Sequence, residues 1–303
     1  MNILCCTSNE YSPYAGVMLA SLFENNKSIK FTVYVFTTGL CPENLERMAM
    51  LEKKYGNAIC VKNFSEQDLK IKIPGDWGIY PFLKLYAIHV LDDIDSLLYL
   101  DTDMIVVSGI SEIADMDIGD NYIALAPDCG PIADHRKRLD ISPESFYGNS
   151  GLIYYNLKKC RENNIWEKCA AFINNNDSLI RYADQDVFNK VCSGHIYEMG
   201  LEWNMQSYYY LNSPKVQPQY KDQLKCKKTK PKVIHYTCIK PWYRDCDFPL
   251  KKEYLKYERM LGWHLPHLLS KKYTPLRFYI NKLKYLLQRL GLHSFDYLYE
   301  LSL

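Results

Sequence analysis

Two aspartates two residues apart give the strongest chemical signal in the sequence. Asp101 and Asp103 lie in the segment YLDTDMIV, between two apolar runs that are typical of buried strands. In an extended segment residues i and i+2 point the same way, so both carboxylates can converge on one object. Charges beside buried strands are costly unless a cation or donors meet them. The pair therefore suits Mn²⁺ or Mg²⁺, and a surface turn with two solvated aspartates is the alternative.

A histidine and a lysine follow a third apolar run. The segment KVIHYTCIKPW places His235 at the end of this run and Lys240 in the loop after it. Imidazole is a good ligand for Mn²⁺, and the lysine ammonium is a point charge that suits phosphate. A histidine bonded to backbone and an ordinary surface lysine are the alternative.

Two further clusters combine carboxamides with carboxylates. Asn149 lies in YGNSGLIY, which we expect to be a polar turn that enters a strand. In YADQDVFN, Asp184 fits a helix N-cap and Asp186 would lie in the first turn, which is a purely structural role. A carboxamide next to a carboxylate, as in Asp184 and Gln185, also suits recognition of sugar hydroxyls.

Alternating strand and helix patterns supply the elements that would position these groups. Such alternation over the first hundred residues indicates βαβ units, a mostly parallel sheet with a central first strand, and ligand-binding loops at the carboxyl ends of the strands. We expect an exposed connection over 215–232 and helical structure from 250 to the end. Strands are predicted at 3–6, 31–36, 58–61, 97–100, 122–126, 151–155 and 232–235, and helices at 13–23, 45–51 and 82–91.

The composition narrows the class of protein. A chain of 303 residues with 48% hydrophobic and 24% charged residues supports a large α/β core and excludes a disordered or fibrous protein. The 11 cysteines are scattered without a C-x-x-C pair, which indicates a reducing compartment and excludes a zinc ribbon. We find no basic leader and no apolar stretch of ~18 residues, and expect a cytoplasmic protein.

Taken together and in order, the four clusters resemble glycosyltransferase family eight, which contains bacterial lipopolysaccharide α-glycosyltransferases and glycogenin. YLDTDMIV is similar to the family's Y-L-D-x-D motif, YGNSGLIYYNL to its F-N-(A/S)-G-V block, ADQDVFN to its D-Q-D segment and HYTCIKPW to its H-x-x-G-x-x-K-P-W end motif. The resemblance implies a GT-A fold, an α/β architecture with a Rossmann-like, mixed and mostly parallel sheet. It covers a catalytic domain over 1–250, followed by a basic amphipathic helical region over 251–303.

The resemblance also implies an activity. It implies a retaining, metal-dependent transfer of glucose or galactose from a UDP-sugar to a glycan acceptor in lipopolysaccharide or other cell-surface polysaccharide synthesis. The implied ligands of Mn²⁺ or Mg²⁺ are Asp101, Asp103 and His235. The residues implied to bind the nucleotide are Cys6, Thr7, Tyr11, Lys84, Asp101, Thr102 and Lys240. Those implied at the transferred sugar are Asn149, Asp184 and Gln185, with Asp128 near the acceptor.

The sequence departs from the family pattern in three places. Ser8 stands where the family often has an aspartate, and Thr237 and Cys238 stand where its end motif has a glycine. Lys84 keeps the charge of an arginine but loses its bidentate geometry. Two other classes stay open. A metal-dependent nucleotidyltransferase or phosphohydrolase would use paired aspartates but would not need the other three blocks, and a non-catalytic sugar-nucleotide binding protein could keep the same fold.

The C-terminal region has its own charge. Residues 259–295 contain seven basic and no acidic residues, so the net charge of +2 combines +7 in this segment with −5 in the rest. Apolar residues at helical spacing predict an amphipathic helix that contacts an anionic membrane through 271–290. Packing of this helix on the catalytic domain is the alternative. The predicted apolar face consists of Leu276, Tyr279, Ile280, Leu283, Leu286, Leu287 and Leu290.

Overall fold

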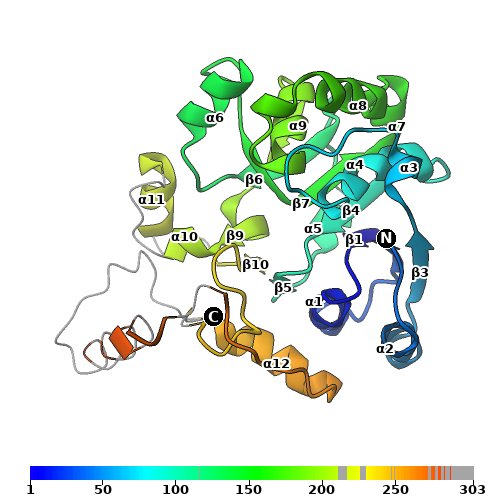
Figure 1. The fold of residues 1–303 in the computed structure, drawn as a ribbon, viewed down its shortest axis with the longest axis vertical. Coiled ribbons are helices and arrows are strands. Elements are labelled where there is room, and N and C mark those ends of the chain that lie inside the picture. The colour runs from blue at the N-terminus through cyan, green and yellow to red at the C-terminus, as the bar shows by residue number, and fades with distance from the viewer. Residues whose placement is uncertain are drawn as a thin grey trace.

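A seven-stranded sheet forms the centre of the molecule (Figure 1). The computed structural model describes the chain except residues 115, 211–216, 226–229, 247, 249, 272, 273, 277, 278, 281, 282, 284–286 and 288–303. The strands are β1 (Asn2–Cys6), β2 (Thr32–Thr37), β3 (Ala58–Asn63), β4 (Ser96–Leu100), β6 (Ile123–Pro127), β7 (Gly148–Asn156) and β8 (Ile196–Glu198). Their order is β3-β2-β1-β4-β7-β6-β8, and β7 runs antiparallel to both of its neighbours while the other pairs are parallel. The predicted mixed, mostly parallel sheet with an interior first strand is confirmed.

Helices cover both faces of this sheet (Figure 1). In β1, Ile3 and Cys5 pack into the core beneath α1 and α2, whereas Leu4 and Cys6 pack into the core beneath the helices of the opposite face. Because both faces are buried at β1, β2, β4 and β6, these strands are mostly apolar and could be recognised in the sequence. One face carries α1 (Ser12–Glu24) and α2 (Pro42–Tyr55), and the other carries α4 (Tyr80–Val90), α7 (Leu157–Glu162), α8 (Ile165–Asn175) and α9 (Ala183–Val191).

A small second sheet lies beside the first and carries part of the candidate site. It contains β5 (Met104–Val106), β9 (Met205–Gln206) and β10 (Val233–His235), with β10 in the middle, antiparallel to β5 and parallel to β9. Its core includes α12 (Lys251–Leu261), which also packs against α1. The aromatic side chains buried in this core include Tyr236, Trp242, Tyr254 and Tyr257.

Short helices complete the described part of the chain. They are α3 (Glu66–Leu69), α5 (Ser111–Ala114), α6 (Ile132–Leu139), α10 (Ser207–Tyr210) and α11 (Pro218–Lys225), with 3-10 turns at Asp177–Leu179 and Leu201–Asn204. The expected exposed connection over 215–232 is wrong in part, because α11 forms there and buries Leu224.

The C-terminal region differs from a continuous helix. Helix α12 ends where Gly262 adopts a left-handed conformation with φ of 67°, and residues 263–270 contain no helix, so the prediction of helical structure from 250 onward is wrong over these residues. In the predicted apolar face, Leu286 and Leu290 lie outside the described residues. Among the described residues, no helix is long and apolar enough to span a membrane. The proposed boundary near 250 stays a prediction.

Candidate active site

The paired aspartates lie at the carboxyl end of the central strands, where a parallel sheet places ligand-binding loops. Strand β4 ends at Leu100 and β5 begins at Met104, so Asp101, Thr102 and Asp103 form the turn between them. The expectation that Asp101 and Asp103 converge because they share an extended strand is therefore wrong. They converge because this turn brings both carboxylates towards the neighbouring strand β10.

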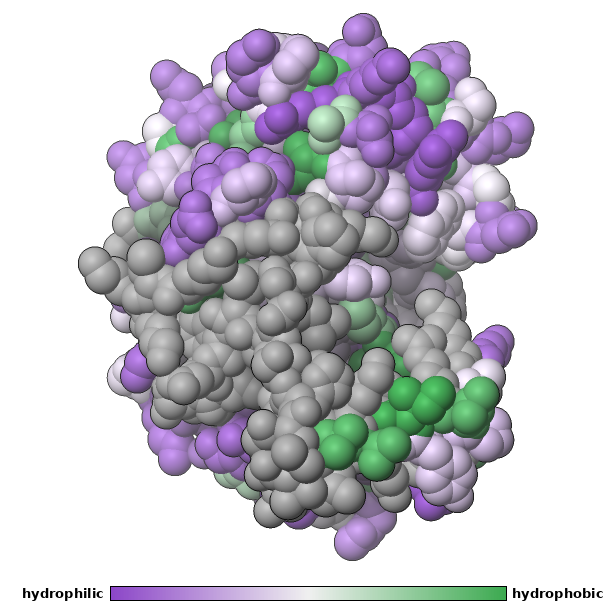
Figure 2. Space-filling model, turned by 90° about the vertical axis from the view of Figure 1, so that its left-hand side faces the viewer, coloured by the Kyte–Doolittle hydropathy of each residue, from purple (hydrophilic) through white to green (hydrophobic). Residues whose placement is uncertain are grey.

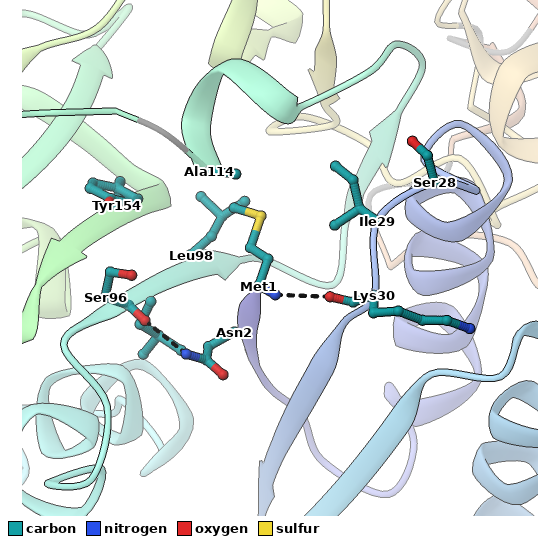
Figure 3. Close-up of a pocket in the computed structure, with 10 residues that line it drawn as sticks. Met1, Asn2, Ser28, Ile29, Lys30, Ser96, Leu98, Ala114 and Tyr154 are labelled. Atoms are coloured by element: carbon teal, nitrogen blue, oxygen red, sulfur yellow. Dashed lines mark hydrogen bonds between the residues drawn. The ribbon is translucent and has the colours of Figure 1, made fainter.

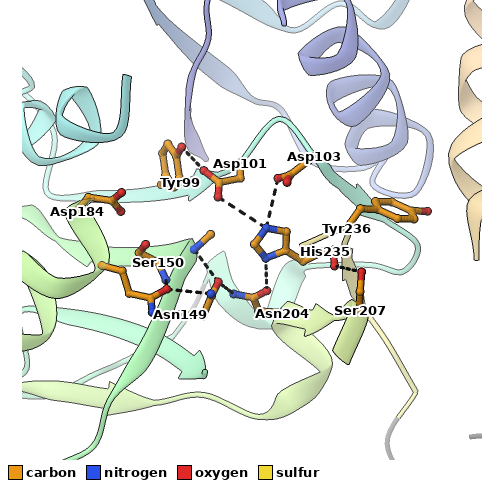
Figure 4. Close-up of polar contacts among 12 residues, drawn as sticks. Tyr99, Asp101, Asp103, Asn149, Ser150, Asp184, Asn204, Ser207, His235 and Tyr236 are labelled. Atoms are coloured by element: carbon orange, nitrogen blue, oxygen red, sulfur yellow. Dashed lines mark hydrogen bonds and ion pairs between the residues drawn. The ribbon is translucent and has the colours of Figure 1, made fainter. Parts of the chain in front are cut away.

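Strand β10 delivers His235 to these two carboxylates (Figure 4). Its Nε2 lies 3.3 Å from Asp103 Oδ1 and 3.8 Å from Asp101 Oδ2. One ligand atom from each of the three residues lies within 4.8 Å of the others. Two carboxylate oxygens and an imidazole nitrogen are donors that suit Mn²⁺, so the residues present fit a divalent metal ion.

Gly151 makes room for the imidazole of His235. A Cβ added at this position would lie 2.3 Å from Cε1 of the ring, which is shorter than any tolerable contact. A residue with a side chain would not fit at this position of the NSGL segment, because the ring passes directly over the β7 backbone. The expected turn at YGNSGLIY is wrong, since residues 148–151 belong to strand β7.

Lys84 is a buried cation between two carboxylates. This residue of α4 is 4% exposed, and its Nζ lies 3.1 Å from Asp101 Oδ1 and 3.1 Å from Asp184 Oδ2. Burial alone would lower the pKa of Lys84, but Asp101 and Asp184 raise it, and the net shift is upward. Tyr99 supports this arrangement, because its hydroxyl donates to Asp101 Oδ1 at 2.5 Å and its ring lies under the ammonium.

Lys240 provides a second cation on the other side of the aspartate pair. Its Nζ donates to Asp103 Oδ2 and to the carbonyl of Tyr236, the latter at 2.9 Å. Burial alone would raise the pKa of Asp103. Lys240 and His235 lower it by more, so the net shift is downward. The carboxylate pair is therefore held between two lysines, an arrangement suited to an anionic ligand together with a cation.

The predicted nucleotide-binding residues of the first strand gather at the same end of the sheet. Cys6 ends β1 and Thr7 follows it, and both are buried. Burial raises the pKa of the Cys6 thiol well above its usual value, so this thiol stays neutral. Tyr11 is exposed and packs edge-on against Trp242 with ring centroids 5.7 Å apart. Ser8 accepts the backbone N–H of Tyr11 at 3.3 Å and so holds the turn before α1.

Carboxamides and a carboxylate form a network beside the predicted metal ligands. Asn149 Nδ2 donates to Asp128 Oδ1 at 3.0 Å and to Gln185 Oε1 at 2.9 Å. Asn204 Nδ2 donates to Asn149 Oδ1 at 2.8 Å, and Asn204 Oδ1 lies 2.9 Å from His235 Nδ1. The structure thus brings together the residues predicted at the sugar and at the acceptor, and joins them to the predicted metal ligands.

Helix α9 starts differently from the prediction. Its N-cap is Tyr182 and Asp184 lies in the first turn with its side chain on Lys84, so the N-cap assignment of Asp184 is wrong. The capping function belongs to Asp186, whose Oδ2 accepts the backbone N–H groups of Arg181 and Tyr182 at 2.7 and 2.8 Å. Ala183 has a φ of 41°, a conformation that costs a residue with a Cβ about 1–2 kcal/mol.

A pocket of about 400 Å³ lies at the opposite end of the central strands (Figure 3). It is lined by the starts of β1 and β4, with Asn2 Nδ2 bonded to the carbonyl of Ser96 and the Met1 ammonium bonded to the carbonyl of Lys30. Its described lining residues include no carboxylate, histidine or cysteine. The chemistry therefore gathers at the carboxyl ends of the strands.

Sequence reasoning missed two residues of the site, Tyr99 and Asn204, and one residue that supports helix α9, Arg138. Tyr99 stands inside an apolar strand, and Asn204 stands between two apolar residues in WNM, so neither is distinguished from core. Arg138, which pairs with Asp186, lies 48 residues from it in a basic helix that is typical of a solvated surface. The short spacing of Tyr99, near the end of β4, to Asp101, in the turn after it, is the single signal that could have indicated a partner.

Comparisons with known proteins agree with this geometry. The family described as "Glycosyl transferase family 8" matches residues 2–246. General stress protein A of Bacillus subtilis is 27% identical over 280 residues, which cover 87% of this chain and 95% of that protein. Lipopolysaccharide 1,2-glucosyltransferase of Escherichia coli K12 is 25% identical over 259 residues, which cover 84% of this chain and 76% of that protein.

The fold has a close counterpart among solved structures. The crystal structure of the galactosyltransferase LgtC, in complex with donor and acceptor sugar analogs, matches with a TM-score of 0.75 and 22% identity, covering 93% of this chain and 100% of that chain. The predicted GT-A fold is confirmed. The family match decides against the nucleotidyltransferase, phosphohydrolase and non-catalytic alternatives. The chain belongs to glycosyltransferase family 8 and is a glycosyltransferase.

Proposed function

We propose that this enzyme transfers glucose or galactose from a UDP-sugar to a glycan acceptor, with retention of anomeric configuration, in the synthesis of lipopolysaccharide or another cell-surface polysaccharide. The observation that carries the proposal is the cluster of Asp101, Asp103 and His235 between Lys84 and Lys240. A nucleoside diphosphate is a poor leaving group until its charge is neutralised. Two lysine ammonium groups and a candidate site for a divalent cation lie together here. Relatives named as lipopolysaccharide glucosyltransferases and a galactosyltransferase support the choice of hexose.

The proposed roles follow from the contacts. Asp101, Asp103 and His235 would hold Mn²⁺ or Mg²⁺, which when bound supplies Lewis-acid stabilisation of the departing diphosphate. Lys240 is placed to exchange Asp103 for a phosphate oxygen, and Lys84 keeps a fixed positive charge beside the reacting centre. The loop residues Cys6, Thr7 and Tyr11, together with Thr102, would hold the nucleotide.

The carboxamide network would bind the transferred sugar. Asn149 and Asp184 would bind its hydroxyls, and Asp128, one hydrogen bond from Asn149, would lie towards the acceptor. Gln185 would face the anomeric carbon. Because a neutral carboxamide is a poor nucleophile, we favour attack by the acceptor on the face from which the diphosphate leaves, with Gln185 stabilising the oxocarbenium-like centre.

A donor screen tests the proposed reaction. Release of the nucleoside diphosphate (UDP, ADP or GDP) is measured with Mn²⁺ across UDP-glucose, UDP-galactose, UDP-N-acetylglucosamine, ADP-glucose and GDP-mannose, without acceptor. We expect turnover of UDP-glucose or UDP-galactose, a loss of at least about 100-fold in Asp103→Asn, and no change in Asp92→Asn, an exposed aspartate. Turnover restricted to non-uridine nucleotides, or unchanged turnover with EDTA, would overturn the proposal.

The stereochemistry and the role of Gln185 have separate tests. Proton NMR during hydrolysis of the α-linked donor should show the α-anomer of the free sugar first, since retention preserves its configuration. First appearance of the β-anomer would contradict retention. Near-normal turnover in Gln185→Ala would remove that residue from the mechanism without affecting the donor assignment.

We also propose that the enzyme works at the cytoplasmic face of a membrane, where a lipid-linked glycan acceptor would lie. Apolar side chains of the C-terminal region are strongly exposed, and the face in Figure 2 shows apolar side chains gathered at its lower right. Together with the basic residues of 259–295 they suit an interface rich in anionic lipid. These exposed side chains are Leu268, Leu269, Leu276, Tyr279, Ile280 and Leu283.

Vesicle sedimentation tests this location. We expect binding to phosphatidylglycerol-containing vesicles, weaker binding to pure phosphatidylcholine, and loss of binding in Leu276→Asp/Ile280→Asp. Leu45→Asp, which changes an exposed leucine of α2, is the matched control. Equal binding of all three proteins would refute the assignment of the membrane contact to this region.

A further inference from the structure

Asn204 links a proposed metal ligand to the proposed sugar-binding residues (Figure 4). Its Oδ1 lies 2.9 Å from His235 Nδ1, and its Nδ2 donates to Asn149 Oδ1 at 2.8 Å. The carboxamide is completely buried, and both of its ends are bonded to side chains of the site.

The directions of the hydrogen bonds that link Asn149, Asn204 and His235 follow from one backbone group. The N–H of Gly151 donates to Asn149 at 3.0 Å, which identifies the accepting atom as the oxygen Oδ1. The amide group of Asn149 therefore faces Asp128 and Gln185, both of which offer acceptors. Asn204 must then present its own amide group to Asn149 and its oxygen to His235.

This order determines which nitrogen of His235 carries the hydrogen. Because Asn204 Oδ1 can only accept, Nδ1 of the imidazole is the donor, and the lone pair of the neutral ring is on Nε2. That nitrogen is the one that faces Asp101 and Asp103, at 3.8 and 3.3 Å. A lone pair directed at two carboxylates is favourable when a cation lies between them.

We propose that Asn204 is the positioning residue that holds His235 in the tautomer and orientation needed to bind a divalent metal ion, and that it couples this ligand to Asn149 at the donor sugar. The proposal deepens the proposed function and rests on its metal assignment. Groups that orient a metal-bound histidine typically contribute 10–100-fold to metal affinity. Gly151 makes room for the ring in this orientation, because a Cβ at that position would lie 2.3 Å from Cε1.

Titration of Mn²⁺ in the absence of donor tests the proposal without turnover. The six-line electron paramagnetic resonance signal of free Mn²⁺ reports the affinity, and nitrogen modulation of the spin echo of bound Mn²⁺ reports the bond to imidazole. We expect Asn204→Leu to bind about 10-fold more weakly with reduced nitrogen modulation. Asn26→Leu, which removes another buried carboxamide bonded to Leu22 and Ile110, should bind like the wild type.

Asn204→Asp separates the two ends of the link. Its carboxylate still accepts from His235 Nδ1, so we expect Mn²⁺ affinity at least equal to that of the wild type. The same carboxylate faces Asn149 Oδ1 without a hydrogen to donate, so hydrolysis of the donor should fall about 10-fold. Unchanged affinity in Asn204→Leu, or lost affinity in a folded Asn204→Asp, would overturn the proposal. Absence of Mn²⁺ binding by the wild type would instead overturn the metal assignment of the proposed function.

Discussion

Two buried aspartates of helix α9, two residues apart, are bonded in opposite ways. Asp186 accepts hydrogen bonds from both Arg138 guanidinium nitrogens, from the Tyr147 hydroxyl and from two backbone N–H groups. Asp184 lies 3.1 Å from Lys84, a cation that it must share with Asp101. The two residues are both aspartates of the same helix, but they accept different numbers of hydrogen bonds.

The pKa values of the two carboxyls shift in opposite directions for this reason. Burial raises the pKa of both, but the donors around Asp186 outweigh burial and lower it, whereas at Asp184 burial outweighs the effect of Lys84 and the pKa rises. A carboxylate with excess donors stabilises the fold. A carboxylate short of donors is costly unless a ligand completes it, which is typical of a functional site.

Asp184→Asn should have the largest effect on activity. It removes a charge beside the proposed reacting centre, and we expect kcat/KM for donor hydrolysis to fall by at least about 100-fold, or roughly 3 kcal/mol. Its free energy of unfolding should change by less than about 1 kcal/mol, because Lys84 keeps Asp101 as a partner. Urea unfolding and UDP release measure the two effects. Activity above a tenth of the wild type would contradict the functional assignment of Asp184.

Asp186→Asn should show the reverse. It leaves the partly buried Arg138 without its fully buried partner, and we expect a loss of about 3–5 kcal/mol in the free energy of unfolding. Turnover per folded molecule should stay within about 10-fold of the wild type. Arg138→Met is the matched partner variant and should lose a similar amount. A loss below about 1 kcal/mol in both variants would show that the pair is not structural.

The sequence could predict the sheet but could not distinguish these two aspartates. The apolar runs at 31–36 and 97–100 predict strands because both faces of the sheet are buried. The motif around Asp184, Gln185 and Asp186 predicts a helix start. Which carboxylate caps that helix depends on a backbone turn at Ala183 with positive φ, and residue types do not specify such a turn.

Hydrogen-bond partners that are far apart in the sequence could not be predicted from local sequence patterns either. Asn204 bonds to Asn149, 55 residues away, and Arg138 bonds to Asp186, 48 residues away, so both contacts are tertiary. The cluster of Asp101, Asp103 and His235 could be predicted because paired aspartates and a strand-end histidine are unusual beside apolar runs. A buried carboxamide next to tryptophan, as at Asn204, is usual in a core, so it carried no signal.

Opposite pH dependence is a smaller and more specific consequence of the comparison. Asp186 has a lowered pKa in the folded state, so its contribution is present above the unfolded value of about 3.9 and is lost as the pH falls below it. Asp184 has a raised pKa, so its contribution is present below that value and is lost as the pH rises through its folded pKa. In metal-free urea unfolding from pH 3.5 to 7, Asp186→Asn should lose stability relative to the wild type as the pH rises, and Asp184→Asn should gain it. Parallel slopes would contradict the assignment.

Tyr99→Phe should have the smallest effect, because Asp101 keeps Lys84 when the hydroxyl is removed. The Tyr99 hydroxyl is a neutral donor to Asp101, and the ring beneath Lys84 is unchanged. The loss of one such hydrogen bond predicts a fall in kcat/KM of about 3–10-fold, or ~1 kcal/mol.

Tyr236→Phe is the matched control, because its hydroxyl donates to the carbonyl of Leu250, away from the carboxylates. Tyr236→Phe should lose about as much free energy of unfolding as Tyr99→Phe, and it should keep full activity. If both variants lose activity equally, the hydroxyl of Tyr99 acts through the fold. If only Tyr99→Phe loses activity, then the hydroxyl of Tyr99 contributes to the reaction through Asp101, although it is a neutral donor. The five donors at Asp186, in contrast, stabilise helix α9.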